Sequence, residues 1–259
     1  MCRILAYTGA PARLADLVFG GDHSLYEQSW KPRELLSGSV NADGYGVAWY
    51  TGGQPARIAE ARPIWYDDGL RSTLQVIESG TVVAALRNGT QGIPVDRSGL
   101  LPLVHERWTF ALNGFVPDFR RSHMRALRDF LPDDLYGELR GASDSETLFL
   151  LAISELRSGA DLHEALAITA RRVKARVGSE EAQLNMLLSD GDVAAAVRSS
   201  TVAATNSLYV AERPTFAKGG TVLASEAPNA DPAWTAVDEH SWIEIGSDGG
   251  IRSDSLTLE

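Results

Sequence analysis

Cys2 is the only cysteine of the chain, and it directly follows the initiator methionine. Removal of Met1 would leave a thiol and a free α-amine on the same residue. An α-amine has a pKa of about 7.7–8.0, so it can be neutral near physiological pH and accept the thiol proton. This arrangement would make Cys2 a nucleophile that carries its own base. The alternative is that Cys2 is a small apolar residue at the start of a buried strand.

The histidines do not form a second recognisable site. They fall in neither a metal-ligand spacing nor a triad motif, and one cysteine cannot form an internal disulfide or a cysteine-based zinc site. The five are His23, His105, His123, His163 and His240. A cysteine that uses its own amine as base needs no catalytic histidine, and we expect no metal and no organic cofactor.

The composition is that of an ordinary globular protein, with 44% hydrophobic and 22% charged residues among 259. No linker-like stretch interrupts the chain, and we expect a single domain over residues 1–259. The net charge of −10 argues against a nucleic-acid partner, which requires a basic surface. Because neither an apolar run of about 18 residues nor a secretory signal is visible, we expect no membrane partner and a cytoplasmic location.

Short apolar or alternating runs predict strands on both sides of the middle of the chain. The predicted strands are 3–7, 45–50, 81–87, 107–113, 183–188, 193–198, 207–212, 221–226 and 242–246. Asp190-Gly191 lies between two of these runs. It predicts a two-residue hairpin turn in which both central positions favour positive φ.

Two helices are predicted together in mid-chain, over residues 145–159 and 161–178. Apolar residues recur in both at helical spacing, and Asp161 with Glu164 predicts a capping box at the start of the second. A third helix is predicted around residues 124–130. Helices grouped between blocks of strands favour the α+β class, with antiparallel sheets packed against helices.

Five short motifs occur together in this chain. They are MCR at the start, NADGYGVAWY (41–50), RNGTQG (87–92), LNG (112–114) and SDSET (143–147). In this order and spacing they resemble the class II glutamine amidotransferase domain of the N-terminal nucleophile hydrolases. The resemblance implies the fold of that family, a four-layer αββα sandwich, which agrees with the grouping of helices and strands.

Within that superfamily, MCR, NADGYGV and a late LASE (223–226) are most similar to small γ-glutamyl amidohydrolases of ergothioneine biosynthesis. The resemblance implies hydrolysis of γ-glutamyl-hercynylcysteine sulfoxide, with release of glutamate. A further stretch, HSLYEQSW (23–30), resembles a related subunit that degrades glutathione in fungi.

The resemblance also implies roles in catalysis. Cys2 would attack the γ-carbonyl to give a thioester that water hydrolyses. Asn113 would donate a side-chain N–H, and Gly114 a backbone N–H, to the oxyanion. Loss of one such donor typically costs about 2.7–4 kcal/mol of transition-state stabilisation. The alternative for Asn113-Gly114 is a plain type I′ turn between strands.

Arg87 ends a strongly apolar predicted strand, where an unpaired charge is costly. The resemblance implies that its guanidinium binds the α-carboxylate of the substrate through two parallel hydrogen bonds. Thr90 and Gly92 would shape the loop around the same carboxylate. The alternative is a structural ion pair at the strand end.

Asp144 would accept the α-ammonium group of the substrate, by the same resemblance. Its alternative role is local. Ser143 and Glu146 resemble a capping box, and a carboxylate is favoured in the first turn of a helix in any case.

Asn41, Asp43 and Gly44 match a loop that lies beside the nucleophile in the family, although Asp43-Gly44 could equally be only a turn. Three positions depart from the pattern of many members, and one of them is Leu103, where an aromatic residue often follows a nearby proline. Leu112 stands where they have histidine, and Gly89 stands where they have a small side chain. These departures remove no proposed catalytic group, but they leave the leaving group of the substrate open.

If the leaving group carries a trimethylammonium, aromatic faces would help to bind it. Trp30, Tyr45 and Trp65 are candidates by neighbourhood, with the core as the alternative place for each.

Two further functions also stay open. One is a glutaminase or glutathione-degrading subunit that acts with a separate partner. The other is a catalytically silent binding protein that retains Met1. We expect a small γ-glutamyl substrate, and a homo-oligomer is left open.

Overall fold

The computed structural model describes residues 2–36, 38–89, 97–202 and 204–258, in which thirteen strands form two sheets. The first sheet contains β1 (Arg3–Arg13), β2 (Gly44–Thr51), β3 (Gln54–Glu60), β4 (Glu78–Arg87), β9 (Tyr209–Glu212), β10 (Gly220–Ala224) and β11 (Thr235–Ala236). The second contains β5 (Leu103–His105), β6 (Trp108–Phe115), β7 (Gln183–Ser189), β8 (Val193–Arg198), β12 (Ser241–Gly246) and β13 (Ile251–Ser255).

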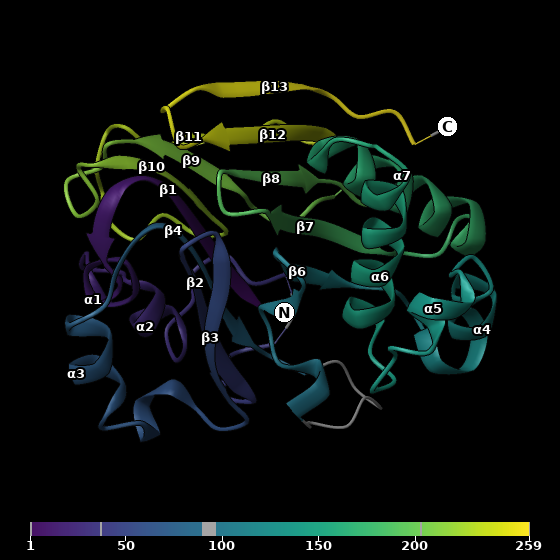
Figure 1. Cartoon of the computed structure of the whole chain (residues 1–259), viewed down its shortest axis with the longest axis horizontal. Coiled ribbons are helices and arrows are strands. Elements are labelled where there is room, and N and C mark those ends of the chain that lie inside the picture. Colours follow the sequence, from purple (N-terminus) through teal and green to yellow (C-terminus); the bar gives the residue numbers. More distant parts are fainter. Residues whose placement is uncertain (1, 37, 90–96, 203, 259) are drawn as a thin grey trace.

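All paired strands in these two sheets are antiparallel. The strand order is β11-β9-β10-β1-β4-β2-β3 in the first sheet and β13-β12-β8-β7-β6-β5 in the second. The sheets face each other, because β1 and β4 contact β6 (Figure 1).

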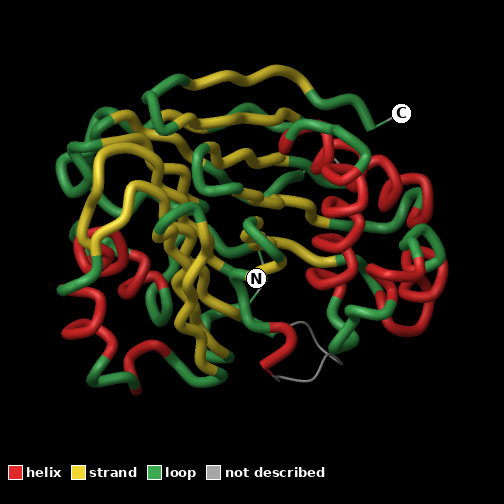
Figure 2. The backbone as a smooth tube through the Cα atoms, in the orientation of Figure 1, coloured by secondary structure: helices red, strands yellow, loops and turns green. Residues whose placement is uncertain are grey.

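Helices cover the outer face of each sheet, as Figure 2 shows. On the first sheet lie α1 (Leu14–Phe19), α2 (Leu25–Gln28) and α3 (Leu70–Gln75), and on the second lie α6 (Asp144–Arg157) and α7 (Leu162–Val177). The shorter α4 (Met124–Arg128) and α5 (Asp133–Tyr136) pack against α6. Three further short helical segments are η1 (Ile64–Tyr66), η2 (Arg97–Gly99) and η3 (Phe119–His123). The expected α+β class and four-layer αββα sandwich are therefore confirmed. No helix among these residues is long and apolar enough to cross a bilayer.

Strand β1 shows how the layers are held together. Successive side chains of a strand point to opposite faces. Ile4 and Ala6 accordingly join the core between the sheets, and Leu5 and Tyr7 join the core under the outer helices. Because both faces are buried, the central strands have nearly continuous apolar sequences, which is why they were predictable.

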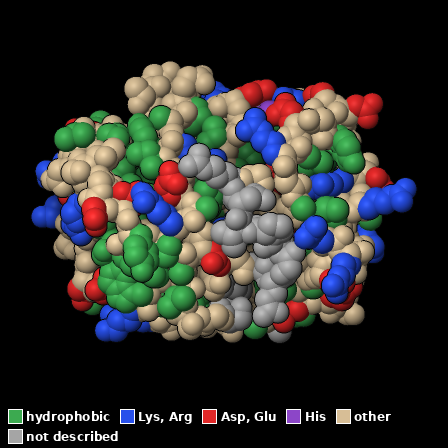
Figure 3. Space-filling view, turned by 90° about the horizontal axis from the view of Figure 1, so that it is seen from below, with side chains coloured by type: hydrophobic (Ala, Val, Ile, Leu, Met, Phe, Trp, Pro, Cys, Tyr) green, Lys and Arg blue, Asp and Glu red, His purple; other side chains and the backbone are tan. Residues whose placement is uncertain are grey.

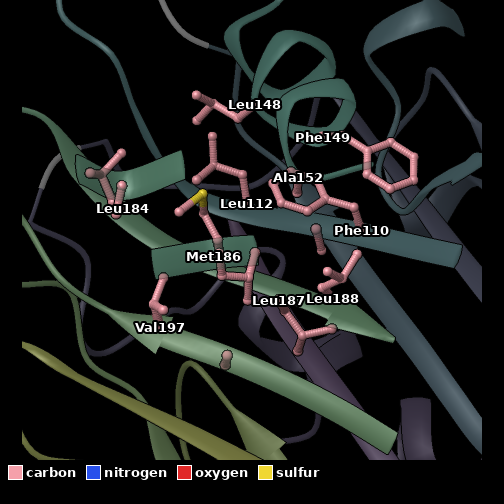
Figure 4. Packing of buried hydrophobic residues seen from close by; sticks show 14 of the residues in the cluster. Phe110, Leu112, Leu148, Phe149, Ala152, Leu184, Met186, Leu187, Leu188 and Val197 are labelled. Carbon is pink, nitrogen blue, oxygen red and sulfur yellow. The ribbon is translucent and has the colours of Figure 1, made fainter. Parts of the chain in front are cut away.

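The core between the second sheet and its helices is packed with large side chains. Figure 4 shows Leu148 and Phe149 of α6 beside Phe110 and Leu112 of β6. Leu112 stands where many family members have histidine, and here it is a fully buried core residue. Its neighbour in the same strand, Asn113, points to the other face of the sheet.

The nine predicted strands and three predicted helices are all present, with ends that shift by a few residues. The capping box of Asp161 and Glu164 is formed. The predicted hairpin turn is wrong by one residue. Asp190 and Val193 close the turn through a backbone hydrogen bond, which leaves Gly191 and Asp192 at the centre. Of these two, only Gly191 has positive φ.

Candidate active site

A pocket lies where β1 begins and β4 and β6 end, beside the first turn of α6. Its described walls are formed by Cys2, Arg87, Asn88, Gly89, Gly99, Leu101, Gly114, Ser143, Asp144 and Ser145. Adjacent strands in one sheet bring Cys2 and Arg87 together, since Arg3 pairs with Leu86. The facing sheet contributes Gly114, and α6 contributes Asp144. Four residues predicted from separate motifs thus meet at one place.

Cys2 is buried in this pocket, with 7% of its surface exposed. Its Sγ lies 3.9 Å from the carbonyl oxygen of Asn88, to which the thiol donates. Burial raises the pKa of the Cys2 thiol above its ordinary value, because the thiolate is poorly solvated there. A thiol in this environment needs a base to become a nucleophile near neutral pH.

Asn113 and Gly114 lie inside β6, opposite Asn185 and Leu184 of β7, so the alternative of a turn is wrong. Neither Nδ2 nor Oδ1 of Asn113 has a hydrogen-bond partner among the described residues, although the side chain is fully buried. A buried amide without partners costs free energy. Asn113 is adjacent to the wall residue Gly114, and its free amide suits a ligand oxygen.

The guanidinium of Arg87 forms one side of the pocket, with 6% of the residue exposed. Gly99 makes room for it. A Cβ at that position would lie 3.3 Å from both terminal nitrogens of Arg87. Sequence reasoning missed Gly99, because it lies outside every motif. Thr90 and Gly92, predicted beside Arg87, fall outside the described residues.

Asp144 is the first residue of α6, and only 4% of its surface is exposed. Its carboxylate accepts hydrogen bonds from the backbone N–H groups of Val116 (3.0 Å) and Ser145 (2.8 Å). Burial raises the pKa of the Asp144 carboxyl group, and these hydrogen bonds only partly oppose the rise. The predicted capping box is half formed. Ser143 Oγ accepts from the Glu146 N–H, whereas the Glu146 carboxylate binds the preceding loop.

Asp43 and Gly44 support the wall without lining it. Asp43 Oδ2 accepts a hydrogen bond from the Gly89 N–H at 2.6 Å, and the Asp43 N–H donates to the Arg87 carbonyl at 3.1 Å. Gly44 pairs with Arg87 across β2 and β4. Its φ is +152°, and a Cβ would lie 2.9 Å from the Glu60 carbonyl oxygen, so this position favours glycine. These contacts fix the backbone around Arg87.

Asn41 and the three candidate aromatic residues lie away from the described pocket walls. The fully buried Asn41 donates from Nδ2 to the Gln28 carbonyl at 3.1 Å. Tyr45 is a core residue, and Trp30 packs edge-on against Trp65 with ring centroids 5.9 Å apart. Trp30 is 39% exposed. The face of the molecule seen in Figure 3 carries a cluster of hydrophobic side chains.

Sequence reasoning also missed the residues that hold the backbone carbonyl of Cys2 in place. Arg3 Nε donates to the Cys2 carbonyl at 2.7 Å, and Arg3 is paired with Glu226. Both residues belong to quoted motifs, MCR and LASE, but no role was predicted for either. Within the described part of the chain, no three His, Cys, Asp or Glu side chains gather as a metal site.

Comparison with known proteins supports the resemblance to the class II glutamine amidotransferases. The model of the class II glutamine amidotransferases matches residues 20–227. The γ-glutamyl-hercynylcysteine sulfoxide hydrolase of Mycolicibacterium smegmatis is 32% identical over 250 residues, covering 95% of this chain and 96% of that enzyme. An enzyme of the same name from Mycobacterium tuberculosis is 31% identical over 251 residues, covering 96% and 94%.

Solved structures agree in fold. A glutamine aminotransferase class-II domain protein from Silicibacter pomeroyi superposes with a TM-score of 0.74 at 27% identity, covering 99% of this chain and all of that one. The allosteric regulatory enzyme of purine biosynthesis superposes with a TM-score of 0.62 at 15% identity. The present chain is covered completely in that superposition, but only 50% of the other chain is.

Proposed function

Because the chain belongs to the class II glutamine amidotransferase family, we propose that it hydrolyses γ-glutamyl-hercynylcysteine sulfoxide to glutamate and hercynylcysteine sulfoxide. The observation that carries this proposal is the meeting of Cys2, Arg87, Gly114 and Asp144 in one pocket. The near full-length similarity to hydrolases of that name supports the choice of substrate.

The proposed reaction starts once Met1 has been removed. The neutral α-amine of Cys2 takes the thiol proton, and Sγ forms a bond to the γ-carbon of the substrate. The carbonyl electron pair moves onto oxygen, where Asn113 and Gly114 donate hydrogen bonds. When the oxyanion collapses, the C–N bond breaks and the leaving amine takes the proton from the ammonium. Water, deprotonated by the same amine, then cleaves the thioester to release glutamate and restore the thiol.

The two charged groups on the α-carbon of the glutamyl group would each be bound by a side chain of opposite charge. Arg87 would donate two parallel hydrogen bonds to the α-carboxylate, and Thr90 and Gly92 would shape the loop around it. Asp144, as a carboxylate, would accept from the α-ammonium. Burial disfavours the charged form of Asp144, so an ammonium ligand would restore it by supplying the missing positive charge.

The wider expectations form part of the same proposal. Residues 1–259 would form one domain that works in the cytoplasm on a small molecule, without a metal, an organic cofactor, a nucleic acid or a membrane. The net charge of −10 supports the exclusion of nucleic acid.

The test is a substrate panel with purified enzyme and no partner protein. We expect kcat/KM for glutamate release to be at least tenfold higher with γ-glutamyl-hercynylcysteine sulfoxide than with glutamine or glutathione. Cys2→Ala should abolish release while the melting temperature is kept. Preference for glutamine or glutathione would favour the glutaminase or glutathione-degrading alternative. Activity in Cys2→Ala would exclude the mechanism.

Intact-mass measurement addresses the third possibility, a silent binding protein. We expect the protein purified from cytoplasmic expression to lack the mass of Met1. Retention of Met1 throughout the sample, together with no release of glutamate, would favour the silent protein.

A further inference from the structure

Next to Cys2 lies a buried ion pair, Arg3 with Glu226, that the proposed reaction does not use. Arg3 has no exposed surface, and its Nη1 lies 2.6 Å from Oε1 of the fully buried Glu226. The same guanidinium donates from Nε to the carbonyl oxygen of Cys2 at 2.7 Å. One buried cation therefore connects the backbone of the nucleophile to a residue 223 positions away.

Glu226 is held firmly by partners other than Arg3. His23 Nε2 lies 2.7 Å from its Oε2. The backbone N–H groups of Arg33 and Glu34 each donate to the carboxylate at 2.9 Å. Both carboxylate oxygens thus have two partners, so the acceptor for Arg3 cannot rotate freely.

The strand pairing fixes the same segment from the side. Ser225 N–H donates to the Ile4 carbonyl at 2.9 Å, and Ile4 N–H donates to Ser225 Oγ at 3.0 Å. On the other side of β1, Arg3 pairs with Leu86 of β4. The backbone that follows Cys2 is therefore held on one side by Ser225 and on the other by β4.

An N-terminal nucleophile has a particular need for such support. Once Met1 is gone, Cys2 is joined to the protein by one peptide bond only, so its carbonyl is the main-chain group through which its orientation can be fixed without blocking the amine. A buried ion pair is weak as a stabilising device, since well-packed apolar residues often replace one without loss. The contact with the Cys2 carbonyl gives this pair a function that apolar residues could not supply.

We propose that Arg3, held in place by Glu226 and His23, is a positioning residue that orients the Cys2 peptide so that Sγ faces the γ-carbonyl carbon of the substrate. This inference rests on the proposed function. Arg3 acts through Cys2 and touches neither substrate nor reacting atoms.

The main test separates positioning from stability. Arg3→Met and Glu226→Gln should each lower the melting temperature, because each leaves one buried partner without its counterpart. The double variant removes both charges and should recover most of the stability lost in Arg3→Met. We expect its kcat to stay at least tenfold below wild type, with KM within twofold. A double variant with wild-type kcat would overturn the inference.

Arg3→Lys gives a second, milder test. It keeps the positive charge, but a single ammonium group cannot reproduce the fork that reaches both Glu226 and the Cys2 carbonyl. We expect a near wild-type melting temperature and a kcat reduced at least tenfold. As a control for the double variant, Arg172→Met with Glu155→Gln removes a partly exposed ion pair (2.6 Å) between α6 and α7, and should leave kcat unchanged.

A measurement without turnover distinguishes this inference from the proposed function. Labelling of Cys2 by a diazo-ketone analogue of glutamine, followed by intact mass, reports how well the thiol is presented. Slower labelling of Cys2 in Arg3→Lys than in wild type would support positioning, whatever the result of the substrate panel. Failure of wild type to release glutamate from any panel substrate would reject only the proposed function. Unchanged labelling and kcat in Arg3→Lys would reject positioning alone.

Discussion

At the scale of single residues, the amide of Asn113 is the most informative group in the site. It is fully buried, and neither of its polar side-chain atoms has a partner among the described residues. Asn206 Nδ2 donates to its backbone carbonyl at 3.0 Å, which fixes the position of the residue but does not satisfy its side chain. A group that is held in place yet left without partners is well suited to an oxyanion that exists only during the reaction.

We therefore predict that Asn113→Ala lowers kcat by about 100–1000-fold, the effect of losing about 2.7–4 kcal/mol of oxyanion stabilisation. Thermal stability should fall little, because the substitution also removes an unsatisfied polar group from the interior. Steady-state kinetics and thermal melting measure the two effects.

Asn185, which is paired with Asn113 in the sheet, is the matched control. Its Nδ2 donates to the carbonyls of Asn206 and Ser207 at 3.0 and 3.1 Å, so Asn185→Ala should lose more stability than activity. If Asn113→Ala instead keeps its kcat, the oxyanion role belongs elsewhere.

At the scale of elements, β6 and β7 leave no room for a side chain at Gly114, where β6 forms part of the pocket wall. A Cβ at Gly114 would lie 1.9 Å from the carbonyl oxygen of Gln183. That distance is far inside van der Waals contact, and neither atom belongs to a flexible side chain. A side chain at this position would therefore push the two strands apart beside the proposed oxyanion donors, Asn113 and Gly114.

Gly114→Ala should destabilise the protein by about 1–3 kcal/mol or more, as forced overpacking does, and should lower kcat as well because β6 must shift. Gly137→Ala is the control, since a Cβ there would lie 3.4 Å from its nearest neighbour, Asp133 O. Denaturant unfolding and kinetics of both variants test this. Equal stability of the two would show that the strands can separate at no cost.

The sequence predicted the strands in the interior of each sheet and missed those at the edges. Strand β3 has an exposed or half-buried side chain at every position, and β13 is mostly exposed. Both lie at an end of their sheet, where pairing on one side is enough and the apolar pattern is weak. Helices such as α1, with six residues, are too short for a helical period to be distinguished.

Of the site, the sequence predicted the residues that lie in short local motifs and missed the contacts between distant segments. Short local motifs identified Cys2, Arg87, Gly114 and Asp144, all of which line the pocket. The pairing of Arg3 with Glu226 could not be predicted, because a single sequence carries no signal for a contact between distant residues.

At the scale of the whole molecule, the site depends on both ends of the chain. The central core includes residues from Cys2 to Leu256, and β1 at the start pairs with β10 near the end. We propose from this that the site and the fold are lost together on unfolding. The two buried carboxylates near Cys2, Glu226 and Asp144, should then contribute to the free energy of unfolding with opposite dependence on pH.

Glu226 and Asp144 differ in the direction of their shifts. Burial raises the pKa of Glu226, but the His23 hydrogen bond, the Arg3 charge and two backbone N–H groups outweigh it, so that its pKa is lowered. Its stabilising effect is present above the unfolded pKa, about 4.3, and is lost as pH falls through the folded value. Burial dominates at Asp144 and raises its pKa. Its favourable contribution is present below the unfolded pKa, about 3.9, and is lost as pH rises through the folded value.

We therefore predict that two isosteric variants change the acid sensitivity of the protein in opposite directions. Glu226→Gln should be less stable than wild type at neutral pH but lose less stability on acidification, because it removes a group that must be ionised in the fold. Asp144→Asn should lose more stability on acidification than wild type, since it removes a group whose protonation is favoured by folding. Urea unfolding between about pH 7 and pH 3.5 spans both unfolded pKa values and measures these slopes. A change of the same sign in both variants would contradict the opposite electrostatic environments of the two carboxylates.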